Sequence, residues 1–510
     1  VLALDWDSFP RGAAIGGRSA RAVENWDAVI IGGGLGGLSC AAAFARQGFR
    51  PLVLEQHKVA GGYATSFRRP GGFVFDASLH STSVGERGGV ANLIPGFPEI
   101  ESVEFVPHEV LYRGIFPQHE IRVAHKDPAA YFRQLRDMFP AETEGLQHLE
   151  QTMVTLVDEL GRYQAAGPNV NQANFPRDYP TMLRCFGATW GQIQDANLKD
   201  PQLKGLVSAM WGYFGLPPSK LAAFYYVLPV MGYLQNGGYY PRGRSQDISD
   251  AFVRFVEGRG GKVVTGARVD RILTRDHAAY GVRTADGQEH LGRVVVSNAN
   301  AYDTFHAMMD EREFLGEYLA RLDGFRPSLS SFQVFLGLKE DLVGKLGLTD
   351  TEIFWESTYD TEASYRVAVA AEVEKGGFGL TLYDNLLPDY SPKGKNTLSI
   401  ITLQGYDPWL PFETDYFAGR KDAYRREKER MADVLIDQVE ATLMPGLRKA
   451  IEVREVATPL TNVRYTRNYR GAIYGWEQVL ENSMPRRLPH KTPIGNLYLA
   501  GAWTQPGGGY

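Results

Sequence analysis

Three glycines at a characteristic spacing are the residues of this chain whose chemistry is most readily predicted. Gly32, Gly34 and Gly37 form a G-x-G-x-x-G pattern directly after the apolar run at residues 29–31 and before a helix of small residues. Glycines at these positions allow a tight turn, close approach of the backbone to a pyrophosphate, and close packing of helix on strand. The N–H groups at the start of the helix can then bind phosphate oxygens. The spacing predicts a dinucleotide-binding turn.

A second strand and an acidic residue complete the predicted unit. Residues 41–47 continue the helix, Gly48 ends it, and residues 51–54 fit the next strand, with Glu55 at its end. A carboxylate at this point can accept hydrogen bonds from both ribose hydroxyls. Strand, glycines, helix, strand and acid follow one another in the required order, so an ordinary glycine loop is the less favoured interpretation.

Length and composition restrict the class of protein. The chain has 510 residues, 44% of them hydrophobic, which is enough for a large core and about two to four domains. Its 54 basic and 59 acidic residues are mixed along the chain and give a net charge of -5, so no nucleic-acid partner is expected. The two cysteines, Cys40 and Cys185, are too isolated for a disulfide framework or a metal site, and we expect buried thiols.

No apolar run is long enough to predict a membrane-spanning helix. The most apolar segment, residues 221–234, is interrupted by Pro229 and fits either a buried core helix or an apolar entrance that contacts a membrane in its plane. Residues 1–25 contain no apolar stretch typical of a signal peptide, and residues can precede Val1. These features predict a cytoplasmic protein or one bound peripherally to a membrane.

Hydrophobic periodicity predicts a nucleotide-binding domain built from separate segments. Strands are expected at 260–264, 269–272, 279–283, 293–299, 328–338, 397–403 and 496–501, and amphipathic helices at 143–164, 248–257 and 418–443. The expected division is a discontinuous nucleotide-binding domain (26–99, 236–300 and 485–510), a helical cap (100–235) and a substrate-binding domain (301–484).

Taken in order, five segments resemble the FAD-dependent carotenoid desaturase superfamily. They are DAVIIGGGLGGLSCAAAFARQG, VLEQHKVAGGYATSF, GGFVFDASLH, VVVSNAN and NLYLAGAWTQPGGG. Any one of them is shared with amine oxidases, whereas the ordered set is most similar to phytoene desaturases, carotenoid isomerases and retinol saturases. The resemblance implies an α/β fold with a Rossmann-type FAD-binding domain like that of p-hydroxybenzoate hydroxylase, an antiparallel-sheet substrate domain and a helical cap.

The resemblance also implies FAD as the cofactor and assigns residues to it. The pyrophosphate is expected at Gly32, Gly34 and Gly37, and the ribose at Glu55. Glycines in the remaining positions let backbone N–H groups approach the flavin. The other implied contacts are Gly61 and Gly62 with the flavin linker, the Val269 backbone with adenine, and Gly501, Pro506, Gly507 and Gly508 with the isoalloxazine and ribityl chain.

Three departures from the superfamily pattern change these expectations. Tyr63 stands where many members have arginine, so a phosphate or flavin contact is expected from Arg68 or Arg69. Arg242 and Arg244 flank Gly243 where a glycine pair is usual, which places two charges either near the flavin or in a solvated turn. Members of the superfamily continue into a helix after the final glycines, so sequence beyond residue 510 is expected.

Candidate catalytic residues come only from the resemblance. His80 lies in a segment that passes close to the flavin, and the alternative is a structural histidine bonded to backbone. Tyr474 and Glu477 lie in a stretch that lines the substrate cavity, and they too can be purely structural. No fixed catalytic triad is required, because the reaction needs a dry cavity, the cofactor and at most one group that manages a proton.

The predicted function is that of an FAD-dependent oxidoreductase or isomerase, which acts on C=C bonds of a long apolar polyene or isoprenoid, carotenoid- or retinoid-like. Hydride or electrons are exchanged with flavin N5, and a quinone, oxygen or a soluble donor completes the electron balance. The 26 Tyr and 26 Phe suit a polyene tunnel and equally an ordinary core. Two alternatives stay open: a flavin amine or amino-acid oxidase, and a non-enzymatic lipid-binding protein similar to Rab GDP-dissociation inhibitors, against which the intact glycines and Glu55 argue.

Overall fold

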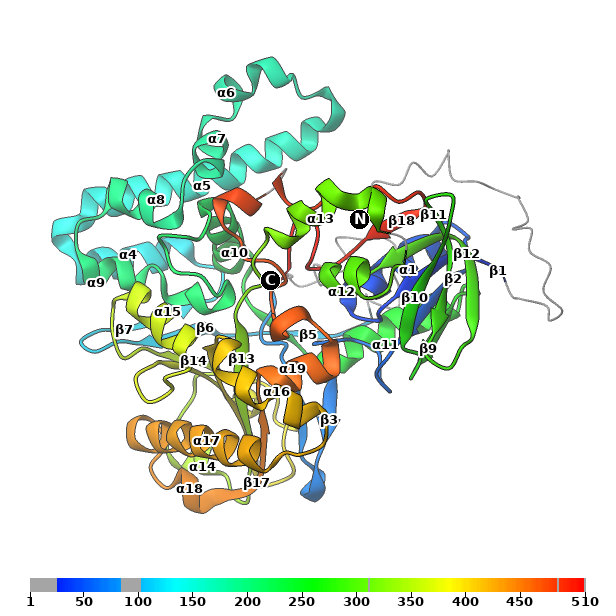
Figure 1. Cartoon of the computed structure of the whole chain (residues 1–510). Helices are drawn as coiled ribbons and strands as arrows, with labels where there is room; N and C mark the ends of the chain where they lie inside the picture. Colours follow the sequence, from blue (N-terminus) through cyan, green and yellow to red (C-terminus); the bar gives the residue numbers. More distant parts are fainter. Residues whose placement is uncertain (1–24, 84–101, 311, 484–485, 509–510) are drawn as a thin grey trace.

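Two seven-stranded sheets and a layer of helices form the protein (Figure 1). The computed structural model describes residues 25–83, 102–310, 312–483 and 486–508. In Figure 1 the first sheet lies on the right, the second sheet at the bottom and the helical layer at the upper left. None of the described helices is both long and apolar enough to cross a membrane.

The first sheet has the strand order β10-β11-β12-β1-β2-β9, with β18 beside β12. Its parallel part joins segments from both ends and the middle of the chain, and β10 and β11 extend it in antiparallel fashion. The bounds are β1 (Asn25–Ile31), β2 (Pro51–Glu55), β9 (Lys262–Thr265), β10 (Val269–Arg275), β11 (Ala278–Thr284), β12 (Glu289–Ser297) and β18 (Leu497–Leu499).

Helices cover both faces of the first sheet, which explains why its central strands are continuous apolar runs. Ala28 and Ile30 pack with α1 (Leu35–Arg46) and α11 (Arg244–Glu257), whereas Val29 and Ile31 pack on the opposite face. That second face is covered by residues of α12 (Ala301–His306) and α13 (Gly316–Asp323).

The second sheet has the order β17-β13-β16-β15-β14-β6-β7 and is antiparallel except where β14 meets β6. A cluster of buried side chains fixes α17 (Asp422–Thr442) and α18 (Leu447–Ala450) against it. The bounds are β6 (Val110–Ile115), β7 (Glu120–Ala124), β13 (Ser330–Leu338), β14 (Glu352–Trp355), β15 (Phe378–Thr381), β16 (Asn396–Gln404) and β17 (Ile451–Ala457).

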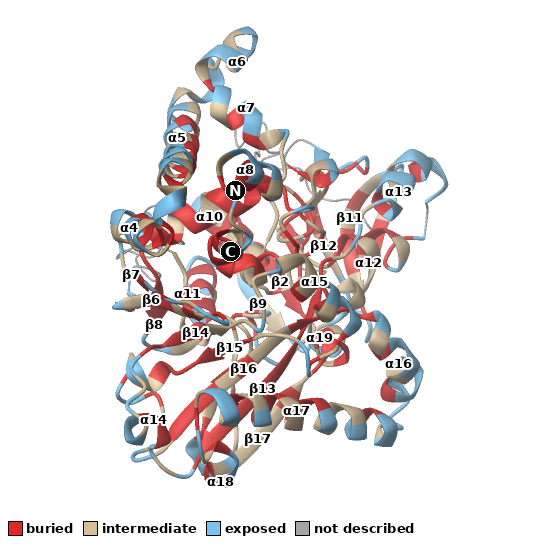
Figure 2. Ribbon diagram, turned by 90° about the vertical axis from the view of Figure 1, so that its left-hand side faces the viewer, coloured by how far each residue is buried: buried red, intermediate tan, exposed pale blue. Residues whose placement is uncertain are grey.

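The helical layer surrounds its own apolar cluster, which includes the most apolar segment of the chain. Helix α10 (Ala223–Asn236) is buried along most of its length (Figure 2). Residues 221–234 are therefore a core helix, and they do not form a membrane-facing surface. The other helices of this layer are α4 (Pro128–Met138), α5 (Thr143–Ala166), α6 (Phe175–Asp178), α7 (Pro180–Phe186), α8 (Trp190–Asn197) and α9 (Pro201–Leu206).

Two expected boundaries need correction. The helical cap was expected from residue 100, but β6 and β7 belong to the second sheet and α4 is the first helix of the layer. The substrate region was expected from residue 301, but α12 and α13 pack on the first sheet. Strand β6 pairs with β14, which is some 240 residues away in the chain, so no pattern within either segment predicts the pairing. The buried state of Cys40 and Cys185 is confirmed.

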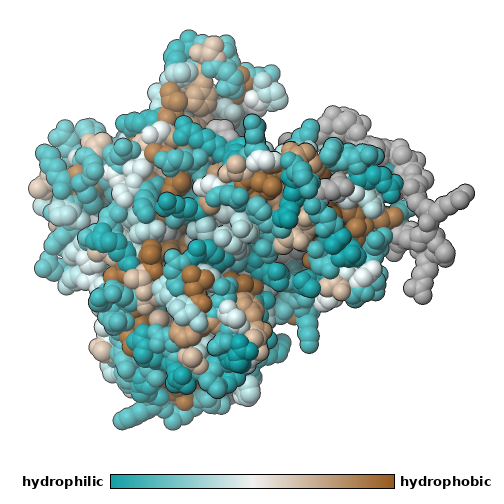
Figure 3. All heavy atoms as spheres, in the orientation of Figure 1, coloured by the Kyte–Doolittle hydropathy of each residue, from teal (hydrophilic) through white to brown (hydrophobic). Residues whose placement is uncertain are grey.

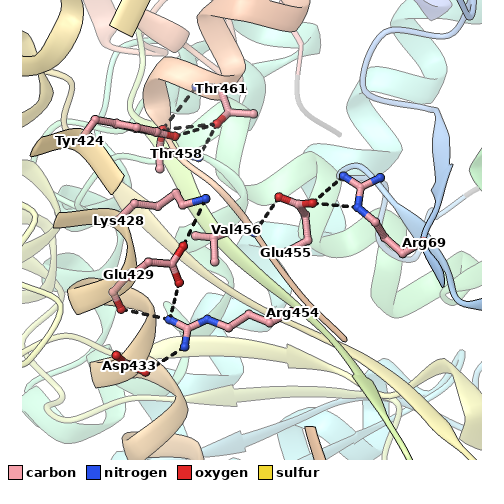
Figure 4. A network of polar contacts seen from close by, with 10 residues as sticks. All are labelled: Arg69, Tyr424, Lys428, Glu429, Asp433, Arg454, Glu455, Val456, Thr458 and Thr461. Carbon is pink, nitrogen blue, oxygen red and sulfur yellow. Dashed lines mark hydrogen bonds and ion pairs between the residues drawn. The ribbon is translucent and has the colours of Figure 1, made fainter. Parts of the chain in front are cut away.

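Ion pairs join the second sheet to its neighbours (Figure 4). Arg69, which follows β3 (Ser66–Arg68), binds Glu455 of β17 through Nε and Nη2 at 2.7 and 2.6 Å. On the other side of β17, Arg454 binds Glu429 and Asp433 of α17 at 3.0 and 2.8 Å. The remaining elements are β4 (Val74–Asp76), β5 (Phe105–Pro107), β8 (Tyr239–Pro241), α14 (Leu342–Lys345), α15 (Thr361–Ala370), α16 (Leu410–Phe417), α19 (Pro459–Thr466) and short 3-10 turns.

Candidate active site

A cavity of about 870 Å³ lies where the first sheet, the second sheet and the helical layer meet. The glycine turn after β1, the end of β2 and the C-terminal loop line one part of it. Side chains from β14, α15, α10 and the 3-10 turn Ala209–Tyr213 line the other part. The predicted nucleotide turn and the predicted substrate region therefore share one continuous space.

The glycine turn has the geometry expected of a pyrophosphate cradle. Gly32 has a φ of +93°, which favours glycine, and a Cβ on Gly37 would stand 2.0 Å from the Gly32 carbonyl oxygen. Gly34 directly precedes α1, so the first N–H groups of the helix are unpaired within it. Gly32 and Gly34 line the cavity, and Gly37 provides the close packing of helix on strand. These features fit the pyrophosphate of FAD.

Glu55 connects the end of β2 with the glycine turn. Its Oε2 accepts the Gly33 N–H and its Oε1 accepts the His57 N–H, each at 2.7 Å. Burial raises the pKa of the Glu55 carboxyl, and these backbone hydrogen bonds oppose the shift. The residue also lines the cavity, as a ribose-binding carboxylate must.

The remaining predicted cofactor residues converge on the same space. Gly61 donates its N–H to the Gly33 carbonyl at 2.7 Å, which brings the second glycine pair against the first. A Cβ on Gly36 would stand 2.8 Å from Cα of Gly501, so α1 and the C-terminal loop are in close contact. The predicted residues that line the cavity here are Gly61, Gly62, Val269, Gly501, Pro506, Gly507 and Gly508.

A buried arginine that sequence reasoning missed holds the C-terminal loop. Arg487 donates from Nε to the Thr504 carbonyl at 2.9 Å and from Nη2 to the Ala502 carbonyl at 2.7 Å. The hydroxyl of Tyr225 in α10 donates to the Pro506 carbonyl at 2.5 Å. The C-terminal loop is thus hydrogen-bonded both to Arg487 and to helix α10 of the helical layer.

The arginines near the cavity differ from those expected. Arg69 is engaged by Glu455, Arg68 is exposed, and neither is among the residues lining the cavity. Arg268 and Arg467 line it instead. No motif identified these two, because their positions depend on where β10 begins and where α19 ends.

The two arginines around Gly243 also lie away from the cavity lining. Arg242 forms an exposed ion pair with Glu104 at 2.6 Å, which agrees with a solvated turn. Arg244 lies over the ring of Tyr390, with its guanidinium carbon 3.7 Å from the ring centroid.

His80 lines the cavity, and a buried carboxylate lies near its ring. Its Nδ1 is 3.5 Å from Oε2 of Glu352, a residue of β14 whose side chain is 1% exposed. The other oxygen of Glu352 accepts the Tyr383 hydroxyl at 2.8 Å.

Tyr474 and Glu477 are separated by the structure. Tyr474 lines the cavity, and its hydroxyl donates to the Gly212 carbonyl. Burial raises its pKa well above the usual range, so the ring is a neutral wall. Glu477, although described, is not among the residues lining the cavity; it lies near Tyr365 and Lys220. The geometry gives no support to a catalytic role for Glu477.

Aromatic side chains form much of the wall beyond His80. Tyr213, Tyr233, Trp211 and Phe354 all line the cavity. Burial raises the pKa of Tyr213 well above its usual value, and the Tyr233 hydroxyl donates to the Ser81 carbonyl at 2.7 Å. This part of the cavity is therefore lined by uncharged aromatic rings, which suit an apolar ligand.

Comparison with known proteins identifies the family. Residues 35–509 match the model of the flavin-containing amine oxidoreductases. The chain belongs to this family. It is accordingly an FAD-dependent oxidoreductase.

Several relatives align with nearly the whole chain. All-trans-retinol 13,14-reductase of Danio rerio is 26% identical over 95% of this chain and 83% of its own length. Prolycopene isomerase 1 of an Oncidium hybrid is 26% identical over 95% and 81%. The neurosporene-forming phytoene desaturase of Rhodobacter capsulatus is 26% identical over 94% and 90%. The expected membership of the carotenoid desaturase and retinol saturase superfamily is thereby confirmed.

Solved structures show the same fold. An oxidoreductase from Methanosarcina mazei has a TM-score of 0.62 at 16% identity and covers 93% of this chain and 94% of its own. Cyclohexylamine oxidase from Brevibacterium oxydans has a TM-score of 0.58 at 15% identity and covers 96% and 95%. The predicted fold class is confirmed by these similarities.

Proposed function

We propose that this FAD-dependent oxidoreductase acts on C=C bonds of a long apolar polyene, carotenoid- or retinoid-like. The observation that carries the proposal is the single cavity, in which the cofactor cradle continues into a wall of neutral aromatic rings. The named relatives reduce retinol, isomerise prolycopene or desaturate phytoene, and this supports a polyene substrate without choosing among the three reactions.

The residues of the chain bind and orient the substrate. Tyr213, Tyr233 and Phe354 present ring faces and edges on which a conjugated chain can stack. Bound FAD would supply hydride or electron exchange with the carbon–carbon unit. An aromatic wall disfavours water beside the bound polyene, which limits side reactions of the reactive species.

His80 is the best-placed side chain to hold or move a proton. The Glu352 carboxylate lies 3.5 Å from Nδ1 of His80, and the His80 ring lines the cavity 6.5 Å from the Tyr213 ring centroid. We assign Tyr474 a positioning role, since its hydroxyl proton is already donated to backbone. A quinone or another small electron carrier would exchange electrons with the cofactor, and contact with a membrane would give access to apolar substrates. On the face shown in Figure 3, apolar residues form small separate patches among hydrophilic ones.

A flavin amine or amino-acid oxidase is the alternative function, and the name of the matched family favours it. It requires a site that binds a polar or cationic substrate; the wall beyond His80 is mainly aromatic but also contains the carboxyl groups of Glu356 and Glu372, so the experiment below includes amines. The non-enzymatic lipid-binding alternative is not supported, because the chain belongs to a flavin enzyme family.

The test is which substrate class exchanges electrons with the bound flavin. Oxidised and chemically reduced FAD-loaded protein would be mixed anaerobically with a panel of polyenes and a panel of primary amines, and the flavin spectrum followed. Polyenes are expected to change the flavin redox state or to be isomerised, and amines to leave it unchanged. Flavin reduction by amines alone would overturn the proposal in favour of an oxidase.

A further inference from the structure

A carboxyl group interrupts the aromatic part of the cavity wall. Glu352 and Phe354 lie on one face of β14, and Glu356 is the first residue after the strand ends at Trp355. Glu352 contacts His80, and Phe354 lies 5.9 Å from the Tyr213 ring centroid. Glu356 lines the cavity, and at about 3.3 Å per residue of extended chain its Cα is at most roughly 13 Å from that of Glu352. A ligand that reaches from His80 to Glu356 would therefore be long.

The Glu356 carboxyl is held in place by neutral donors. Its Oε1 accepts the indole N–H of Trp211 at 3.0 Å, and the Ser364 hydroxyl lies 3.5 Å from Oε2. Gly377 leaves room for the group, because a Cβ there would stand 2.9 Å from Oε2. Among the described residues, the carboxyl accepts from the Trp211 indole and, at a longer distance, from the Ser364 hydroxyl, so its oxygens can accept further hydrogen bonds.

No cation compensates this group within the described chain: none of the ion pairs found there includes Glu356. The two other glutamates nearby differ in this respect, since Glu352 is beside His80 and Glu372, also at the cavity, pairs with Lys375 at 3.0 Å. Burial raises the pKa of Glu356 to about 7, so the group is largely neutral in mildly acidic solution. An uncompensated carboxyl suits a neutral hydrogen-bonding partner better than a purely hydrocarbon surface.

We propose that Glu356 binds a hydroxyl group at the end of the polyene that lies farthest from His80, so that the enzyme prefers hydroxylated polyenes over the matching hydrocarbons. This inference rests on the proposed function and applies whether the bond is reduced, oxidised or isomerised. The carboxyl accepts the substrate O–H, or donates to its oxygen when protonated. A site built to bind a hydroxyl discriminates against an analogue that lacks it, because the group that binds the hydroxyl then loses a hydrogen-bond partner.

The experiment measures binding to the oxidised, FAD-loaded protein, so that turnover is not needed. The ligands are β-carotene and its 3-hydroxyl derivative, together with retinol and the hydrocarbon in which hydrogen replaces the hydroxyl. Binding is followed by quenching of tryptophan fluorescence. The wild type is expected to bind at least one hydroxylated member about ten- to a hundredfold more tightly than its hydrocarbon.

Variants then assign the preference to Glu356. In Glu356→Leu the hydroxylated ligand should lose this advantage while the hydrocarbon binds as well or better, and Glu356→Gln, which keeps an amide at the position, should retain part of it. Glu372→Leu is the matched control, because it removes a cavity carboxylate that is already paired, and the ratio should not change. The flavin spectrum of each variant checks that the fold is intact.

The outcomes separate this inference from the proposed function. Equal affinity of the wild type for both members of each pair would overturn the inference and leave a polyene site in place. An unchanged preference in Glu356→Leu would assign the hydroxyl to another residue and would overturn it as well. Failure of every polyene to bind would contradict the proposed function itself.

Discussion

At the scale of single residues, the cofactor cradle depends on atoms that almost touch. Gly37 lies against the Gly32 carbonyl, and Gly36 lies against Gly501. These contacts follow from a motif with fixed spacing, so Gly32, Gly34, Gly37 and Glu55 could be predicted from sequence. Arg467, Arg487 and Glu356 could not, because nothing in their neighbouring residues indicates which cavity or loop they face.

Replacing Gly37 with alanine should weaken FAD binding more than tenfold. The new Cβ would stand 2.0 Å from the Gly32 carbonyl oxygen, so α1 must move away from the turn that holds the pyrophosphate. The measurement is the FAD content of the purified variant and its affinity on reconstitution. Gly161→Ala in α5 is the control, since a Cβ there meets no atom within 4 Å and should stabilise the helix by about 1 kcal/mol. Normal flavin content in Gly37→Ala would contradict the assignment of the glycine turn as the pyrophosphate-binding site.

The raised pKa of Glu356 predicts a specific pH dependence of stability. Burial raises this pKa from 4.5 to about 7, so between these values the folded protein holds a proton that the unfolded chain releases. The free energy of unfolding should therefore fall as pH rises through this range, by at most about 3 kcal/mol because water can enter the cavity.

The measurement is denaturant unfolding of FAD-free wild type and Glu356→Gln at several pH values. The difference between their unfolding free energies cancels the other titrating groups. That difference should favour the wild type most at low pH and shrink towards pH 8. A difference that does not vary with pH would show that Glu356 titrates normally.

At the scale of elements, local patterns were sufficient for strands and helices that contact their sequence neighbours or have a clear apolar face. The parallel strands around residues 29–31 and 293–299 and the helix α17 lie where periodicity predicts them. Pairing between distant segments was not predictable. The placement of β6 beside β14 is decided by tertiary packing, whereas the burial of α10 agrees with the core helix that was one of the two interpretations of residues 221–234.

Helix α7 offers a test of how far the helical layer depends on one buried carboxylate. Glu159 of α5 is 2% exposed and accepts the N–H groups of Thr181 and Met182 at 3.2 and 2.7 Å, at the start of α7. Glu159→Ala leaves both donors unpaired and should cost about 2–3 kcal/mol, with faster hydrogen exchange in α7. Asp158→Ala, at an exposed position one residue away, should change neither. Unaltered exchange in Glu159→Ala would show that α7 does not need this cap.

At the scale of the whole molecule, the cavity lies at the junction of both sheets and the helical layer. The C-terminal loop reaches all the way to α10 through Tyr225, and the Arg69–Glu455 pair connects β3 with β17. A cofactor in this cavity would therefore stabilise the molecule beyond the sheet that carries the glycine turn.

FAD should raise the free energy of unfolding by about 3 kcal/mol at 100 times its dissociation constant. It should also slow proteolysis in the helical layer and the second sheet, as peptide mapping of the fragments would reveal. AMP, which lacks the flavin and reaches only the adenine side, should protect the first sheet alone. Identical protection by FAD and AMP would argue against a cofactor that spans the junction.

The central claim is that the cofactor site and the aromatic wall act together on a polyene. The most direct measurement is an anaerobic reaction in which the FAD-loaded protein, in its reduced and in its oxidised form, is mixed with polyenes and the products are analysed by mass and chromatographic retention. The account predicts a product that has gained two hydrogen atoms with the reduced flavin or lost two with the oxidised flavin, in an amount no greater than the bound flavin, or a product with changed double-bond geometry, which consumes no electrons and can exceed it. Recovery of every polyene unchanged, with a flavin that amines can reduce, would contradict it.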